Sequence, residues 1–485
     1  MYSRIITTAR ISSILFVLIS LSQTASAQFV SLTEAYTLAL ENDPEIAIAK
    51  ESAKIGAELK TSARAALFPQ LEAFATYRDS TNESNGEFPI TLDQDQNPLT
   101  AEIRALRPVN SETDEISQTW GARLTQVLFD PAAWFNYKQG KFQSRQAELQ
   151  FTLEQTNLIH RLVESYFQGI RSYQMLKVAK SLEAADSNLL ELSKKLKRAG
   201  VTGSVDVFQA QAAVDASHAL RLEAQSTHQE ALAALSYSTG TVVEDLWSLP
   251  EVDLSNVYAL DNLQQWLDAA KKNNLEVRIA DISRQAAKAA YKSALSEHSL
   301  KINADIQYSQ GSSDTYEIDN SLPYDFNSET DGFSVSVNAT LPLFTGGRTS
   351  SNRRRAHHEY LRANAQYAAI VRGVQRQVLS TLHDLAANQQ QIASKRKAVD
   401  SSQKALSAVL RSFQVGAIEL AEVLNTRKAL YEVQRSLIES RINYVLTLTR
   451  LELLSGTLSP HDIAELNDVL VVPPEEKESS LLPLP

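Results

Sequence analysis

The sequence predicts a mainly helical, internally duplicated chain with a smaller β segment, and three observations lead to this fold class. The stretch from Arg348 to Phe413 holds one glycine and no proline, as a very long helix requires. Four other segments alternate apolar and polar residues, which is typical of strands. The same order of elements starts again 231 residues later, so that Leu32 falls on Leu263.

The N-terminus has the features of a secretory signal peptide, residues 1–27. Arg4 and Arg10 precede the apolar run Ile11–Leu21, and Ala25-Ser26-Ala27 is a small-residue cleavage site. Cleavage takes the net charge from -10 to -12, because the segment holds two arginines and no acid. An acidic exported protein is not expected to bind nucleic acid.

The remaining chain contains no cysteine and no apolar run long enough for a membrane helix. The missing cysteines exclude a disulfide framework and a lipid on an N-terminal cysteine. If the protein spans a membrane, it must therefore do so with strands.

The long helix carries one apolar residue in every seven, from Val371 to Phe413. Such a row lies on one helix face and predicts left-handed supercoiling with neighbouring helices. At about 1.5 Å per residue the helix is roughly 100 Å long. Its flanking rows are small or polar. This favours a helix that stands in a wall, with neighbouring helices on both sides and water nearby, over a helix in a dry core. An ordinary coiled-coil rod is the alternative.

Each predicted repeat reads helix, helix, strand, loop, strand, long helix, turn, long helix. Repeat one spans residues 28–258, repeat two spans 259–456, and a tail at 457–485 is expected to be poorly ordered. Polar loops are expected at about 80–115 and 311–331. The expected strands lie at about 70–80, 116–129, 301–310 and 332–342, and the expected long helices at about 132–198, 204–238, 348–413 and 419–454.

Four strands cannot close a barrel, and an open sheet in lipid leaves backbone groups unsatisfied. Closure needs several chains, and three would give a trimeric twelve-stranded β-barrel in an outer membrane, continued by a periplasmic α-helical barrel. A soluble sandwich is the alternative. The residues expected to face lipid are Leu71, Ala73, Tyr77, Trp120, Ile302, Ile306, Tyr308, Phe333, Val335 and Val337.

Several motifs occur in order and, in part, twice. Leu32–Pro44 continues into Glu45, Leu124–Asp130 precedes the first long helix, and Leu341–Gly347 precedes the second. Gly416 lies six residues before Glu422, as Gly200 lies six before Asp206. Over nearly the whole mature chain the sequence resembles the TolC family of outer-membrane efflux and secretion channels.

The resemblance implies a homotrimer that forms a tunnel across the periplasm. Its partners would be outer-membrane lipid, a periplasmic adaptor (membrane fusion) protein and an inner-membrane ABC or proton-driven pump. The exposed turns between the long helices would dock the adaptor. These turns contain Gly200, Val201, Val415, Gly416 and Ala417; glycine there also simply ends a helix.

The family closes its tunnel with an aspartate, a tyrosine and an arginine near these turns. Asp206 occupies the aspartate position, but Phe413 replaces the tyrosine and Ile418 the arginine. Neither replacement offers a polar group for the same lock, so closure is expected to rely on apolar packing of Phe413 and on overwinding of the helices. In the ring of entrance acids Glu422 is retained and Asn425 replaces a second acid; a solvated helix surface is the alternative reading of Glu422.

No catalytic, cofactor or metal site is expected, and the protein is predicted not to be an enzyme. The eight histidines do not cluster at ligand spacing, and no phosphate loop or nucleophile elbow occurs. Two other classes of protein remain. A periplasmic coiled-coil adaptor explains the helices but not the strands, and a secreted adhesin or enzyme explains the signal but not the duplication.

Overall fold

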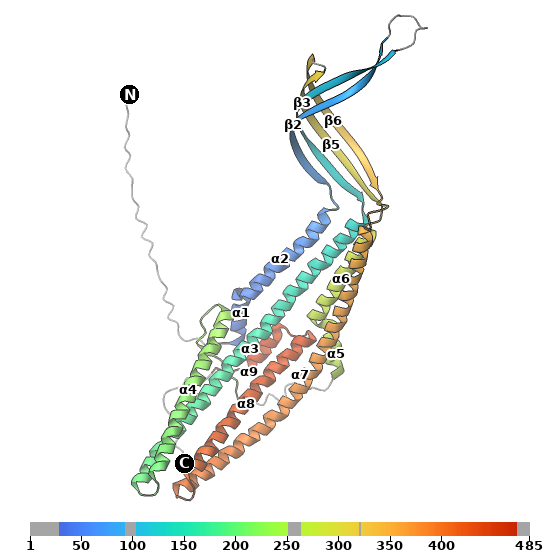
Figure 1. Ribbon diagram of the computed structural model, residues 1–485. Coiled ribbons are helices and arrows are strands. Elements are labelled where there is room, and N and C mark those ends of the chain that lie inside the picture. The colour runs from blue at the N-terminus through green and yellow to red at the C-terminus, as the bar shows by residue number, and fades with distance from the viewer. Residues whose placement is uncertain (1–28, 93–102, 251–262, 320–321, 473–485) are drawn as a thin grey trace, which may run out of the picture.

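A computed structural model describes residues 29–92, 103–250, 263–319 and 322–472, so the predicted signal peptide lies outside the described residues. A four-stranded sheet extends from one end of a long helical layer (Figure 1). The helices are α1 (Leu32–Asn42), α2 (Pro44–Ala65), α3 (Pro131–Arg198), α4 (Ser204–Thr239), α5 (Leu263–Asn273), α6 (Leu275–Ser296), α7 (Arg348–Gln414), α8 (Leu420–Ser455) and α9 (Pro460–Val469).

Helix starts follow from capping residues in the sequence. Asp43 Oδ1 accepts hydrogen bonds from the N–H groups of Glu45 and Ile46, and Asp130 does the same for Ala132 and Ala133. Each aspartate precedes a proline at the first helical position, where a missing N–H costs nothing. These caps separate α1 from α2 and begin α3.

The helices form one wall whose neighbours change along its length. Near the sheet the contacts run α2 to α3, α3 to α6, and α6 to α7. Further from the sheet, α4 packs on α3 and α8 packs on α7, while α3 contacts α8 (Figure 1). The seven-residue row of α7 faces these neighbours, since Val378, Leu385, Ile392 and Phe413 are buried.

The strands are β1 (Phe29–Val30), β2 (Gln70–Leu92), β3 (Ile103–Phe129), β4 (Asp245–Leu246), β5 (Lys301–Asp319) and β6 (Leu322–Thr340). The large sheet is antiparallel in the order β2-β3-β5-β6. A smaller parallel pair joins β1 to β4.

The two predicted loops are largely wrong, because most of their residues continue the strands. β2 extends to Leu92 and pairs with β3 back to Ile103, while residues 93–102 lie outside the described residues. β5 and β6 likewise pair out to Asp319 and Leu322. Backbone pairing satisfies the ladder whatever the side chains are. Residues 81–87 and 111–115 are polar or glycine on both faces, which leaves no alternation from which these parts of the strands can be recognised.

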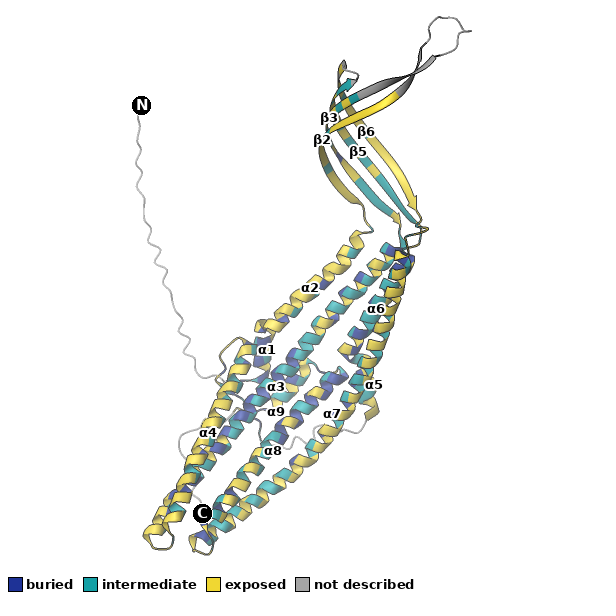
Figure 2. Ribbon diagram, in the orientation of Figure 1, coloured by how far each residue is buried: buried dark blue, intermediate teal, exposed yellow. Residues whose placement is uncertain are grey.

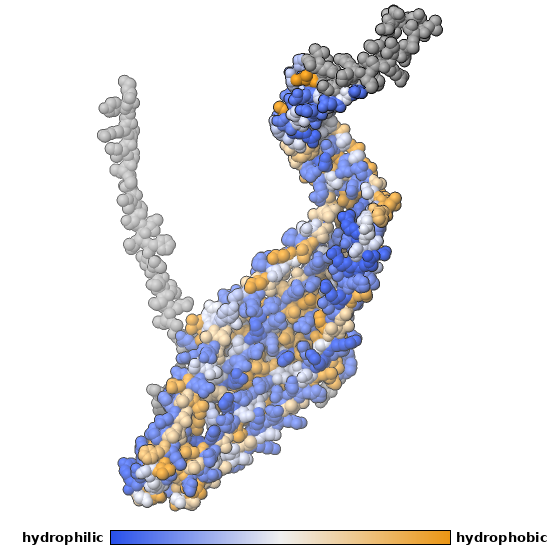
Figure 3. Space-filling view, in the orientation of Figure 1, coloured by the Kyte–Doolittle hydropathy of each residue, from blue (hydrophilic) through white to orange (hydrophobic). Residues whose placement is uncertain are grey.

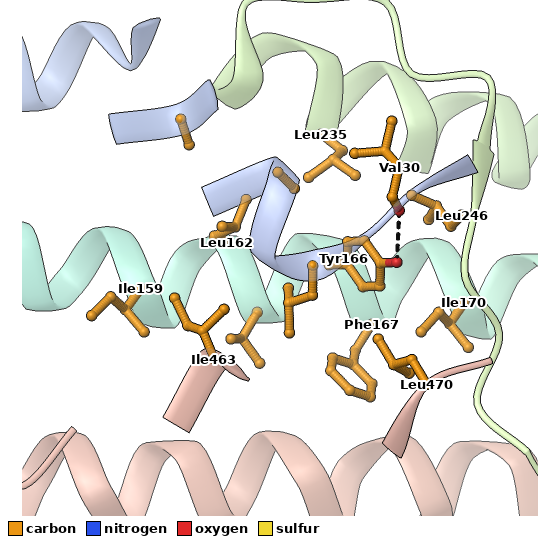
Figure 4. Close-up of a cluster of buried hydrophobic side chains, with 14 of the residues drawn as sticks. Val30, Ile159, Leu162, Tyr166, Phe167, Ile170, Leu235, Leu246, Ile463 and Leu470 are labelled. Atoms are coloured by element: carbon orange, nitrogen blue, oxygen red, sulfur yellow. Dashed lines mark hydrogen bonds between the residues drawn. The ribbon is translucent and has the colours of Figure 1, made fainter. Parts of the chain in front are cut away.

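The main core lies midway along the helical layer, around Tyr166 of α3 (Figure 4). The Tyr166 hydroxyl donates to the carbonyl of Val30 at 2.9 Å and accepts from the N–H of Trp247 at 3.1 Å. Burial raises the pKa of this tyrosine. The hydroxyl therefore joins β1, α3 and the segment after β4. In Figure 2 buried positions concentrate in this middle region, whereas much of the sheet is exposed.

The tail prediction is wrong for residues 458–470, which are ordered and packed. A capping box between Ser459 and Asp462 starts α9, and Leu458, Ile463 and Leu470 are buried in the main core. Val471 then exchanges backbone hydrogen bonds with Ser248. Residues 473–485 lie outside the described residues. Within the part of the chain that the structure covers, no helix is long and apolar enough to cross a membrane.

Candidate functional site

Both helical hairpins end in the same backbone turn, at the end of the helical layer opposite the sheet (Figure 1). Gly200 and Gly416 each have φ of 75°, a left-handed conformation that glycine adopts without steric cost. The N–H of Val201 bonds the carbonyl of Leu196 at 3.0 Å, and the N–H of Ala417 bonds that of Ser412 at 2.9 Å. These six-to-one bonds define a Schellman motif at each tip.

The two tips lie against each other. A methyl group built on Gly416 would sit 3.6 Å from Cγ1 of Val201. Val201 and Val415 nevertheless remain exposed, at 52% and 78%. The sequence-predicted docking residues therefore form one surface, with apolar side chains presented on rigid helix ends.

Behind this surface the ends of α3, α4, α7 and α8 share an apolar cluster. Phe413 is only 1% exposed and lies in this cluster, as the predicted apolar packing requires. Ile418 packs at its edge. We call these residues the tip cluster; its buried members are Leu189, Leu190, Ala210, Phe413, Leu420 and Val423.

The predicted polar residues lie at equivalent places on the two return helices. Asp206 is in the first turn of α4 and Glu422 in the first turn of α8, where acids interact favourably with the helix dipole. Glu422 and Asn425 are exposed, whereas Asp206 is half-buried. Asn425 borders a groove of about 460 Å³ between α3, α4 and α8.

A buried ion pair lies next to the tip cluster, and sequence reasoning missed it. Arg427 Nη1 of α8 donates to Asp186 Oδ1 of α3 at 2.7 Å, and both residues are less than a tenth exposed. Arg427 Nε is also buried and, among the described residues and in this single chain, has no hydrogen-bond partner. The pair therefore joins the two hairpins directly.

The sequence signal for this pair is a charged residue at a position where the helical pattern predicts an apolar one. Arg427 follows Leu420 and Val423 along the buried stripe of α8, and Asp186 precedes Leu189 and Leu190 along that of α3. Opposite charges on two such stripes suggest a buried pair, but only if the two helices are known to be neighbours.

The strand register places all ten residues predicted to face lipid on one side of the sheet. Leu71 lies opposite Leu124, which lies opposite Ile306, which lies opposite Val335. Directly opposed residues point to the same side of a sheet. Trp120 and Tyr308 make an edge-on ring contact with centroids 6.3 Å apart.

The other side of the sheet is polar and hydrogen-bonded between strands. Arg123 donates to Gln307 at 2.9 Å and to Glu72 at 3.4 Å. Asp305 accepts from Thr125 at 2.8 Å and from Asn338 at 2.9 Å. One apolar face and one polar, networked face are what a sheet between lipid and water requires.

The long helical wall, the two-faced sheet and the paired tips together define a channel protein of the outer membrane. A family model described as "Outer membrane efflux protein" matches residues 35–241 and 266–457. The chain belongs to this family. It is located in the outer membrane of a Gram-negative bacterium and serves as an exit duct for efflux or secretion.

Individual relatives agree with this assignment. The chain is 28% identical to the outer membrane protein TolC of Vibrio cholerae over 459 residues, covering 94% of this chain and 98% of the relative. It is 24% identical to the alkaline protease secretion protein AprF of Pseudomonas aeruginosa, covering 90% and 86%. The crystal structure of VceC from Vibrio cholerae shares the fold, with a TM-score of 0.66, 18% identity and coverage of 88% and 96%.

Proposed function

We propose that three copies of this chain close their sheets into one twelve-stranded barrel and continue as a helical cylinder through the periplasm. Among the described strands, β2 and β6 are the edges of the large sheet and each has one unpaired side. Joining the β2 edge of one copy to the β6 edge of the next satisfies both edges. The apolar side of every copy then faces lipid and the Arg123 and Asp305 side faces water.

The periplasmic end of this duct is a gate held by apolar packing. The tip cluster around Phe413 supports this assignment, because it joins the ends of both hairpins in one chain. The polar lock of the wider family is not available here, since Phe413 and Ile418 lack the required groups. Glu422, exposed just behind the turn, contributes one charge per chain to an entrance ring that attracts cations.

The paired turns are the docking surface for a periplasmic adaptor protein, which connects the duct to an inner-membrane pump. The contact between Val201 and Gly416 is the main support, because it combines two exposed turns into one surface on a rigid scaffold. Two relatives are named for secretion of proteases. This favours protein or peptide cargo and an ABC pump over small-molecule efflux and a proton-driven pump.

In-cell cross-linking tests the docking surface, because the chain contains no cysteine of its own. Ala417→Cys places a unique thiol at the second turn. Ala393→Cys, exposed on α7 away from the tip, is the control. Capture of an adaptor with an ABC transporter at position 417 alone supports the secretion assignment, whereas an adaptor with a proton-driven pump indicates efflux. Equal capture at both positions, or capture of neither protein, contradicts docking at the turns.

A further inference from the structure

Basic residues gather where the sheet meets the helices. Four helices, α2, α3, α6 and α7, have an end near the sheet (Figure 1). These ends, with a few flanking residues, are segments 55–66, 130–145, 286–301 and 348–358. Together they hold twelve lysines and arginines but only three acids, although the whole chain has a net charge of -10. We call these basic residues the collar.

The collar is presented to solvent in the single chain. Eleven of the twelve side chains are exposed, and only Lys301, which pairs with Asp130 at 3.6 Å, is half-buried. The highest density is at the start of α7, where Arg348, Arg353, Arg354 and Arg355 precede the first acid, Glu359. Unlike the tip cluster, these charges are spread over several helix ends and do not line a single pocket.

Exposed apolar side chains adjoin the collar on the side of the sheet. Leu343 and Phe344, between β6 and α7, are 85% and 88% exposed, and Phe129 and Trp134 are about half exposed. Figure 3 shows hydrophobic surface at this junction directly beside hydrophilic surface on the adjoining ends of α6 and α7. The charged ends of Lys138 and Lys292 lie 5.4 and 5.5 Å from the ring centre of Phe135. These are cation–π contacts between the ammonium groups and the ring, and both lysines remain exposed to solvent.

The apolar side of the sheet has a boundary at each end. On the side away from the helices, Tyr77, Trp120, Tyr308 and Phe333 form an aromatic row, beyond which the same face is polar on β2 (Asp79 to Glu87) and β6 (Asp331 to Asp325). On the side of the helices, the band ends at Leu343, Phe344 and the collar. Aromatic rows and basic residues are the two kinds of residue that hold proteins at membrane interfaces.

We propose that the collar binds the phosphate groups of anionic phospholipids in the periplasmic leaflet of the outer membrane and so fixes the depth of the sheet in the bilayer. Arginine suits this role because its guanidinium donates two parallel hydrogen bonds to a phosphate. The continuity of the collar with the apolar band favours a bilayer surface over a soluble anion. This inference rests on the membrane placement of the sheet in the proposed function.

Lipid titration of purified protein tests the collar. The variant Arg353→Gln/Arg354→Gln/Arg355→Gln removes three charges per chain. Lys397→Gln/Lys404→Gln/Arg411→Gln removes three exposed charges from the same helix far from the sheet. Native mass spectrometry measures how much phosphatidylglycerol each protein retains, with phosphatidylethanolamine as the zwitterionic comparison. Each basic residue near an anionic surface strengthens binding roughly fivefold. The first variant is therefore expected to bind phosphatidylglycerol at least tenfold more weakly, and the second to bind like the unmodified protein.

Equal retention by all three proteins, or equal retention of the two lipids by the unmodified chain, overturns the collar proposal. Planar-bilayer conductance and oligomeric mass, measured on the same samples, test the proposed function separately. A conducting trimer with unchanged lipid retention contradicts the collar alone, whereas a chain that forms neither trimers nor channels contradicts the duct. Reduced lipid retention with normal conductance also excludes misfolding as the cause.

Discussion

Arg427 and Asp186 form a buried ion pair that joins the two hairpins of one chain next to their tips. The internal duplication does not repeat it. Positions shift by 216 between the two turns, from Gly200 to Gly416, so the equivalents of Asp186 and Arg427 are Ser402 and Gln211. The contacts that the repeat symmetry relates to this pair therefore lack its charges. The ion pair joins the two hairpins of one chain in a way that those symmetry-related contacts do not repeat.

Removing one member of this pair is expected to destabilise the tip more than removing both. A lone buried charge typically costs about 3–5 kcal/mol, whereas replacing a whole pair by apolar residues is often nearly neutral. Arg427→Met should thus speed amide hydrogen exchange around residues 183–193 of α3, and Asp186→Leu/Arg427→Met should largely restore protection. If the double variant exchanges as fast as Arg427→Met alone, the loss of protection does not come from leaving one buried charge unpaired, and this prediction is wrong.

Replacement of Phe413 by alanine is expected to open the gate. Loss of a buried aromatic side chain typically lowers stability by about 3–5 kcal/mol. Neither Phe413 nor Ile418 has a polar side-chain group, so the polar lock of the wider family is not present to offset this loss. Single-channel conductance and sensitivity of cells to large antibiotics should both rise. Leu361→Ala, an exposed position on the same helix, serves as the control. Unchanged conductance and leakage in Phe413→Ala would contradict apolar closure.

Neutralisation of Glu422 is expected to weaken cation selectivity. Three such carboxylates around a narrow entrance attract cations, and Glu422→Gln removes the charge while keeping the shape. The reversal potential in a salt gradient measures this directly. Glu359→Gln, an exposed acid on α7 near the sheet, is the matched control. If Glu422→Gln leaves the reversal potential unchanged, Glu422 is simply a solvated helix residue.

The docking of α9 is expected to weaken as the pH rises. Burial raises the pKa of Glu452 to about 8, and the nearby Asp462 and Glu465 carboxylates add to the effect. The folded chain therefore holds a proton that the unfolded chain releases above its ordinary pKa of 4.5. This contribution to stability is present below about pH 4.5 and is lost as the pH approaches 8. Melting temperatures at pH 5 and pH 8 should differ less in Glu452→Gln than in the unmodified protein.

Much of the fold was readable in the sequence because local signals agreed with the long-range pattern. The seven-residue row ending at Phe413 predicted α7 within one residue of its observed end, and Gly200 and Gly416 marked turns that require left-handed backbone. The strand ends were not readable. Residues 81–87 of β2 and 111–115 of β3 are polar or glycine on both faces, so only pairing with another strand identifies them.

The sequence by itself determined the helices, their turns, the two faces of the sheet near the helices and the duplicated order of elements. These features follow from periodicity and glycine conformation, which depend on residues close together in the chain. Only the tertiary structure revealed the Asp186–Arg427 pair, the packing of α9 on Tyr166 and its neighbours, and the gathering of basic residues from four segments into one collar. Each of these joins residues more than a hundred positions apart, and such proximity is decided by how the elements pack rather than by any local pattern.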